Sequence, residues 1–145
     1  MDTIKIKKIY DNAKLPTYGS PEAAGADLYA CLSAPVSIEP GDTAWISTGL
    51  AMEVPTGCAG LIYARSSMAT KRGLAPANKV GVIDSDYRGE VKVVLYNQSN
   101  EVQIIEPNER IAQLIITPVL TPDYEEVDSL TDTDRGTGGF GSTGK

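Results

Sequence analysis

Side chains that can do acid–base chemistry gather in residues 79–89, KVGVIDSDYRG. Asp84 directly follows an apolar pair, so its carboxylate can lie at the apolar edge of a β-sheet. Loss of water at that edge would fit Asp84 for taking a proton from a water molecule. A hairpin turn, which commonly uses Asp, Ser and Gly, explains Asp86 and Gly89 well but explains Asp84 less well. Asp84 is therefore the candidate general base.

Two further segments carry residue types that bind phosphate. Residues 60–67, GLIYARSS, end an expected strand with Arg65 and two hydroxyl side chains that open a short helix. A helix N-terminus beside an arginine is a natural anion site, although simple N-capping by Ser66 explains the pattern equally well. Near the C-terminus, Arg135 precedes a glycine-rich stretch whose backbone N–H groups can wrap an anion. The forked guanidinium of Arg135 adds a permanent charge there.

Composition excludes several classes of protein. The chain has 145 residues and no histidine, which rules out a Ser-His-Asp triad and a histidine-ligated zinc. Its formal net charge of -6 argues against duplex nucleic acid as the main partner, because phosphate contacts need clustered Lys and Arg. Cys31 and Cys58 are too few for a disulfide framework or a four-cysteine metal site, so we expect free, buried thiols.

Targeting signals are absent from the sequence. The first 20 residues lack the apolar core of a secretory signal peptide. The longest uncharged stretch, residues 111–122, is shorter than the about 20 apolar residues that a membrane helix needs. We therefore expect a protein that is not secreted and has no membrane partner, located in the cytoplasm or, if it is viral, inside the host cell.

Nine prolines and 14 glycines separate short segments in which apolar residues recur with a period near two. These segments predict strands at residues 4–9, 26–30, 43–54, 58–64, 80–83, 90–97, 102–105 and 110–119. Many short strands at this spacing predict an all-β sandwich, barrel or jelly roll. Only residues 66–72 favour a helix, which Gly73 would end. Residues 123–134 carry six acidic side chains and no basic one, so we expect a functional tail with no core of its own.

Five segments of the chain, in order, resemble the five motifs of the trimeric dUTP pyrophosphatases (dUTPases). They are AGADLYA (24–30), ARSSMA (64–69), NKVGVIDSDYRGEVKVVLYN (78–97), ERIAQLI (109–115) and RGTGGFGSTG (135–144). The resemblance implies an all-β, distorted jelly-roll (β-clip) fold with one short helix, assembled as a homotrimer with shared active sites. Residues 1–121 would form the β-barrel core. Residues 122–145 would form an extended arm and glycine-rich tail that closes a neighbouring subunit's site.

The implied reaction converts dUTP and water into dUMP and pyrophosphate, with Mg²⁺ bound to the triphosphate. In the cell it would limit uracil incorporation into DNA and supply dUMP for dTMP synthesis. The resemblance makes Asp84 the general base for the water that attacks the α-phosphorus. It places Gln113 in the phosphate and water network and Arg135 on the γ-phosphate. Asp27 would orient metal-bound waters rather than bind the ion directly.

The remaining implied roles concern substrate binding. Tyr87 would lie against the deoxyribose and leave no room for a 2′-hydroxyl. Asn78 and the backbone around Gly81 and Val82 would recognise the uracil edge, on which Phe140 would stack. The implied phosphate-binding residues are Arg65, Ser66, Ser67, Arg110, Gly141, Ser142 and Thr143, and Lys92 aligns with a position near the uracil loop.

Two other functions fit a chain of this kind. A dCTP deaminase-related enzyme would use a glutamate beside residues 80–84, and none adjoins that segment on its N-terminal side. A dUTP-gated regulatory or binding module on the same fold would be expected to lose a chemical residue, yet Asp84, Gln113 and Arg135 are all present. Regulation as an added function stays open. One departure from the family pattern is Ala64, where many members have proline.

Overall fold

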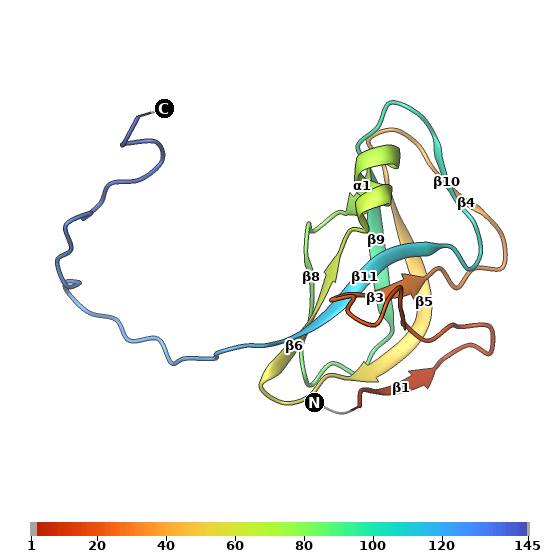
Figure 1. Cartoon of the computed structure of the whole chain (residues 1–145), viewed down its shortest axis with the longest axis horizontal. Helices are drawn as coiled ribbons and strands as arrows, with labels where there is room; N and C mark the ends of the chain where they lie inside the picture. Colours follow the sequence, from red (N-terminus) through yellow and green to blue (C-terminus); the bar gives the residue numbers. More distant parts are fainter. Residues whose placement is uncertain (1–2, 145) are drawn as a thin grey trace.

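The computed structural model describes residues 3–144, which form eleven strands and one short helix (Figure 1). The elements are β1 (Lys5–Lys8), β2 (Thr17–Tyr18), β3 (Ala26–Tyr29), β4 (Val36–Ile38), β5 (Thr43–Glu53), β6 (Cys58–Tyr63), α1 (Ser66–Arg72), β7 (Leu74–Pro76), β8 (Gly81–Ile83), β9 (Val91–Asn97), β10 (Gln103–Ile105) and β11 (Arg110–Pro118). All eight predicted strands are present, with ends within one residue of those expected, and the all-β class is confirmed. The period-two pattern missed only β2, β4 and β7, which are two or three residues long and too short to show a period.

Two antiparallel sheets enclose the core. One has the order β1-β5-β9-β7 and the other β2-β3-β11-β6-β8, while β10 and β4 form a separate two-stranded ribbon. Buried aliphatic side chains from both sheets join one cluster, which includes Leu28, Ile46, Leu95 and Ile111, each fully buried. Burying one such side chain contributes about 1.5–3 kcal/mol. The strict alternation along β9 buries its odd-numbered residues and turns Lys92 outward.

The helix α1 continues directly from β6 and ends where Gly73 adopts a left-handed conformation at φ 64°. Its N-cap residue is Arg65, which makes no side-chain cap, so the interpretation of Ser66 as an N-cap is wrong. Ser66 already lies inside the first turn, where its carbonyl accepts a hydrogen bond from the Thr70 hydroxyl at 2.8 Å. The Arg65 side chain is therefore free to serve the site described below.

A β-bulge interrupts β5 opposite β9. The register shifts between Ser47 and Leu50, and Gly49 between them has φ 68°. A Cβ atom there would lie 2.8 Å from the Ala13 side chain and 2.9 Å from the sulfur of Cys31, so only glycine fits. Both cysteines are free as predicted, but the expectation of burial is wrong, because each is half-buried near the edge of its packing cluster.

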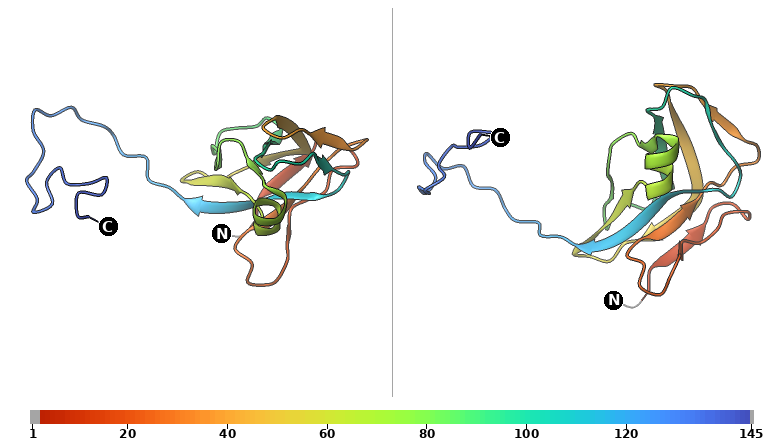
Figure 2. Two further views of the ribbon diagram at one scale, coloured as in Figure 1. Left: turned by 90° about the horizontal axis from the view of Figure 1, so that it is seen from above. Right: turned by 45° about the horizontal axis from the view of Figure 1, so that its top comes forward.

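After β11 the chain leaves the core, and Figures 1 and 2 show it running away from both sheets in every view. Residues 119–144 contain no strand and are exposed except at two half-buried glycines. The last strand ends at Pro118, close to the expected core boundary at residue 121. Residues 1, 2 and 145 of the two expected segments lie outside the described residues. Within residues 3–144, no helix is long and apolar enough to cross a membrane.

Candidate active site

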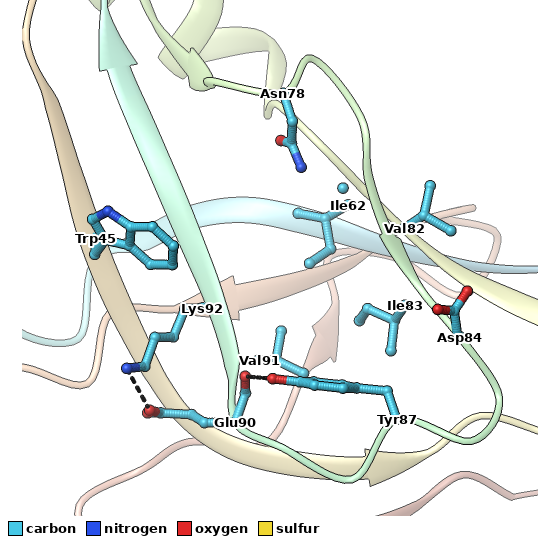
Figure 3. A pocket seen from close by; sticks show the side chains of 11 residues that line it. Trp45, Ile62, Asn78, Val82, Ile83, Asp84, Tyr87, Glu90, Val91 and Lys92 are labelled. Atoms are coloured by element: carbon cyan, nitrogen blue, oxygen red, sulfur yellow. Dashed lines mark hydrogen bonds and ion pairs between the residues drawn. The ribbon is translucent and has the colours of Figure 1, made fainter.

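A pocket of about 470 Å³ opens between β8 with the turn that follows it and the facing parts of β5 and β9 (Figure 3). Six residues that the sequence predicts for the substrate site line it, namely Asn78, Gly81, Val82, Asp84, Tyr87 and Lys92. The other lining residues, which sequence reasoning missed, are Trp45, Ile62, Ile83, Glu90 and Val91. In Figure 3, Trp45 and Lys92 form one wall and the β8 residues form the opposite wall.

The pairing of β6 with β8 shapes the upper part of this pocket. Ile62 pairs with Gly81, and a Cβ atom on Gly81 would lie 3.2 Å from the Ile62 side chain and 3.6 Å from the amide nitrogen of Asn78. Glycine thus lets the Asn78 amide lie close to the exposed edge of the β8 backbone. Amide and backbone groups side by side can donate and accept hydrogen bonds on the edge of a planar ring.

Tyr87 forms the floor of the pocket. Its hydroxyl donates a hydrogen bond to the backbone carbonyl of Glu90 at 2.9 Å, and its N–H donates to the Asp84 carbonyl at 3.1 Å. The ring lies over Gly89, where a Cβ atom would come within 2.4 Å of the hydroxyl oxygen. The turn sequence therefore fixes the ring across the pocket floor, in a position to limit what can lie above it.

Asp84 begins the turn after β8 and is exposed. No side chain among the described residues forms an ion pair or hydrogen bond with its carboxylate. The expectation that Asp84 is desolvated at the sheet edge is therefore wrong for the single chain. The reason is that β8 is an edge strand, so nothing in the same chain covers the turn that follows it.

A second cluster lies on β3, β11 and the end of β6. Asp27 accepts hydrogen bonds from Arg65 Nε at 2.8 Å and from an Arg110 terminal nitrogen at 3.4 Å. The Gln113 amide donates to the Ala64 carbonyl at 2.8 Å. A Cβ atom on Gly25 would come within 2.5 Å of the Gln113 side-chain oxygen, so a small residue is needed beside it.

A cleft of about 310 Å³ adjoins this cluster and is lined by Arg65, Ser67, Met68, Lys71, Arg72, Glu109 and Arg110. Four of these side chains are cationic and one is anionic, so the cleft suits a polyanion. Arg72 is already engaged, because it pairs with Glu109 and donates to the Ile104 carbonyl at 2.5 Å. Ser66 is exposed beside the cleft but does not line it. Lys71 is a cleft residue that sequence reasoning missed.

The pocket and the cleft share no lining residue, and Asp84 lies near the opposite end of β6 from the cleft, although the pocket wall at Ile62 is one residue from the strand end that leads to Arg65. Ile83, just before Asp84, pairs with Gly60, whereas Arg65 lies beyond the other end of the strand. Five residues of extended chain span about 16 Å. The tail residues stay apart from both, and Arg135 donates only to the Gly138 carbonyl of its own turn, at 2.8 Å. Phe140 is fully exposed.

A pocket with an amide edge, together with a basic cleft on a jelly-roll-like fold, indicates a nucleotide-binding β protein. The chain belongs to the dUTPase family, whose family model matches residues 11–144. It is 50% identical over 149 residues to the deoxyuridine 5′-triphosphate nucleotidohydrolase of Desulfitobacterium hafniense, covering 99% of both chains. The protein of the same name from Nautilia profundicola is 50% identical over 142 residues, covering 98% of this chain and 99% of that one.

Solved structures confirm the fold. A mutant dUTPase of Staphylococcus bacteriophage 80alpha, in complex with dUpNHpp, superposes with a TM-score of 0.90 at 28% identity and 100% coverage of both chains. Another mutant of the phage enzyme superposes with a TM-score of 0.88 at 28% identity, covering 97% of this chain and 98% of that one. The jelly-roll-like fold expected from the five motifs is therefore confirmed.

Proposed function

We propose that this chain hydrolyses dUTP to dUMP and pyrophosphate. The observation that carries the proposal is the gathering of Asn78, Asp84 and Tyr87 around one pocket of about 470 Å³ in a chain of the dUTPase family. A ring of pyrimidine size fits between the walls of this pocket. The bound dUTP analogue of the phage relative supports the same class of substrate.

In this mechanism Asp84 accepts a proton from the water that attacks the α-phosphorus. The new P–O bond forms as the bond from the α-phosphorus to the bridging oxygen breaks, and pyrophosphate leaves. Phosphoryl-type transfer depends mostly on positioning and charge stabilisation, so one placed carboxylate is enough and histidine is not required. The exposure of Asp84 in the single chain fits a base that is covered only when substrate and neighbouring chains enclose it.

The chain from Asn78 through β8 to the turn of residues 84–89 selects the base and the sugar. Asn78 and the backbone at Gly81 and Val82 recognise the uracil edge, and Lys92 lies on the opposite wall. The Tyr87 ring across the pocket floor leaves no room for a 2′-hydroxyl on the sugar. A bulky group held by its own turn excludes an extra oxygen effectively, because the ring cannot move aside without breaking its hydrogen bond.

The triphosphate binds at the basic cleft. Arg65 and Arg110 retain donors beyond those that bind Asp27, and Ser66 and Ser67 add hydroxyl groups. Gln113 joins the phosphate and water network. The tail then closes the site: Arg135 reaches the γ-phosphate, Phe140 stacks on uracil, and the backbone of Gly141, Ser142 and Thr143 wraps the phosphates. Arrival of an arginine on a mobile segment is worth on the order of 10³–10⁵ in rate in related chemistry.

Mg²⁺ fits this site only as part of the bound substrate. No group of three potential acidic, cysteine or histidine ligands occurs among residues 3–144. Asp27 is already paired with two guanidinium groups, so it would orient waters around the ion rather than bind it directly, and the triphosphate would hold the ion. A bound Mg²⁺ would neutralise phosphate charge and polarise the phosphoryl oxygens.

A homotrimer with shared sites accounts for the separation of pocket and cleft. The pocket of one chain and the cleft of the next then face the same nucleotide, and the arm and tail of residues 122–145 come from the third chain. The tail's distance from its own core supports this arrangement. We place the protein in the cytoplasm, where it limits uracil incorporation into DNA and supplies dUMP for dTMP synthesis, without duplex DNA or membrane as a partner.

The test is pyrophosphate release from dUTP, UTP, dTTP and dCTP measured in parallel, with and without Mg²⁺. We expect pyrophosphate release from dUTP and almost none from UTP, dTTP or dCTP. Asp84→Asn should release no pyrophosphate but should still bind dUTP. Ammonia release from dCTP would favour the deaminase-related alternative. Binding of dUTP with no pyrophosphate from the wild-type chain would favour the regulatory module.

A further inference from the structure

Glu90 is a pocket residue without a role in the scheme above. Its side chain is only 14% exposed, although it lies directly before β9 at the end of an exposed turn. The carboxylate accepts hydrogen bonds from the Ser47 hydroxyl and, at 3.1 Å, from the Gly49 N–H, and it pairs with Lys92 at 3.6 Å. Glu90 therefore joins the chain between β8 and β9 to β5 through two contacts, and a third contact links it to β9.

The contacts fall on the β5 bulge. Ser47 pairs with Lys92 and Leu50 pairs with Val91. Thr48 and Gly49 between them therefore have no paired residue on β9 and form the bulge. The Gly49 N–H has no ladder partner on β9 and donates to the Glu90 carboxylate instead. A second link comes from the buried Thr48 hydroxyl, which donates to the Val91 carbonyl at 2.5 Å. Bulges of this kind redirect side chains next to functional sites.

The backbone of Glu90 also supports Tyr87, the residue that forms the pocket floor. The Tyr87 hydroxyl donates to the Glu90 carbonyl at 2.9 Å, and Gly89 between them leaves no side chain to hold the ring in place. The height of the ring therefore depends on where the Glu90 backbone lies. That position depends in turn on the Glu90 carboxylate, because the turn of residues 84–89 has no strand of its own (Figure 3).

We propose that Glu90 is a positioning residue for sugar selection: its carboxylate clamps the turn of residues 84–89 to the β5 bulge and so fixes Tyr87 at the height that excludes a 2′-hydroxyl. This inference rests on the proposed dUTP hydrolysis. The clamp acts on selectivity more than on rate, because Tyr87 takes no part in proton transfer. Loss of the Glu90 clamp lets the Tyr87 ring move, so that a nucleotide with a ribose can bind.

The experiment compares kcat/KM for dUTP and UTP in the wild type, Glu90→Ala, Glu90→Gln and Ser47→Ala. We expect Glu90→Ala to lower the dUTP-to-UTP ratio of kcat/KM about tenfold, since small displacements of a positioning group have effects of that order. Glutamine keeps the shape and an acceptor for the Gly49 N–H, so Glu90→Gln should stay within about twofold of the wild-type ratio. Ser47→Ala should act in the same direction as Glu90→Ala but less, and add nothing when combined with it.

Glu53→Gln is the matched control, because Glu53 also lies on β5 and pairs with a lysine, Lys5 at 3.1 Å, but does not line the pocket. It should leave the ratio unchanged. A purely structural role of Glu90 would reduce the active fraction and lower both substrates equally, so an unchanged ratio in Glu90→Ala overturns the clamp. Equal loss in Glu90→Gln and Glu90→Ala also overturns it. A wild type that releases no pyrophosphate overturns the proposed function itself, whereas an active wild type with an insensitive ratio overturns only this inference.

Discussion

Mixed trimers of two inactive variants should recover activity if the pocket and the cleft of one site come from different chains. The variants are Asp84→Asn, which damages the pocket, and Arg65→Gln, which damages the cleft. Loss of a general base typically costs 10²–10⁴ in rate, so Asp84→Asn alone should keep about 1% of wild-type activity or less, and Arg65→Gln should lose activity because a phosphate-binding guanidinium is removed. Both chains keep wild-type tails.

The size of the recovery can be calculated if the pocket and the cleft of one site come from different subunits. About 16 Å of extended chain, from Gly60 on β6 to Arg65 beyond its end, separates the level of Asp84 from the cleft, and we propose that one site takes the two from different chains. In a random one-to-one mixture, half of the pockets and half of the clefts are intact. A site that draws them from neighbouring subunits is complete in about 25% of cases.

The assay is pyrophosphate release after co-refolding equal amounts of the two variants, compared with each variant refolded alone. We expect about 25% of wild-type activity in the mixture. Asp84→Asn mixed with Asn78→Ala is the control: both changes lie in the pocket, so no site can be complete, and activity should not exceed the mean of the two parents. A mixture of Asp84→Asn and Arg65→Gln that stays at the sum of its parents would refute the shared site.

The other predictions concern the tail, the tryptophan and a cysteine. Truncation after Asp134 should leave trimer size unchanged by light scattering but lower the rate on the order of 10³-fold, and a fully active truncation would contradict the role of Arg135. Trp45, the only tryptophan, is 73% exposed on the pocket wall, so dUpNHpp should shift its emission to shorter wavelength, and an unchanged spectrum would place the ligand elsewhere. Burial and then the Glu90 charge raise the pKa of the Cys31 thiol, so alkylation should need a higher pH than for a free thiol. Glu90→Gln removes one of these causes and should move the alkylation profile to lower pH, and an identical profile would refute that coupling.

Local pattern was enough to predict most of the fold and to single out Asp84, Arg65 and Arg135, whereas the other predicted site residues came from the family resemblance. Period-two alternation works along β9 because every second residue faces a single core. The role of Glu90 could not be found in this way, since Ser47 and Glu90 are 43 positions apart and meet only through β5–β9 pairing across a bulge. Trp45 was missed for the same reason. The exposure of Asp84 depends on β8 being an edge strand, which is a property of the sheet order and not of the residues around Asp84.

The positions of the charged residues in the structure also change the interpretation of the acidic composition. The six carboxylates of residues 123–134 equal the whole formal net charge of -6, so the rest of the chain is formally neutral. Around the cleft, four cationic side chains meet the two carboxylates of Asp27 and Glu109, which leaves a local excess of two positive charges. Charges are screened beyond about 8–10 Å at physiological salt, and the arm runs away from its own core. The acidity therefore belongs to the arm and, within the single chain, does not oppose a triphosphate at the chain's own cleft, while a lone excess of two charges is too small for the extended phosphate contacts of a duplex.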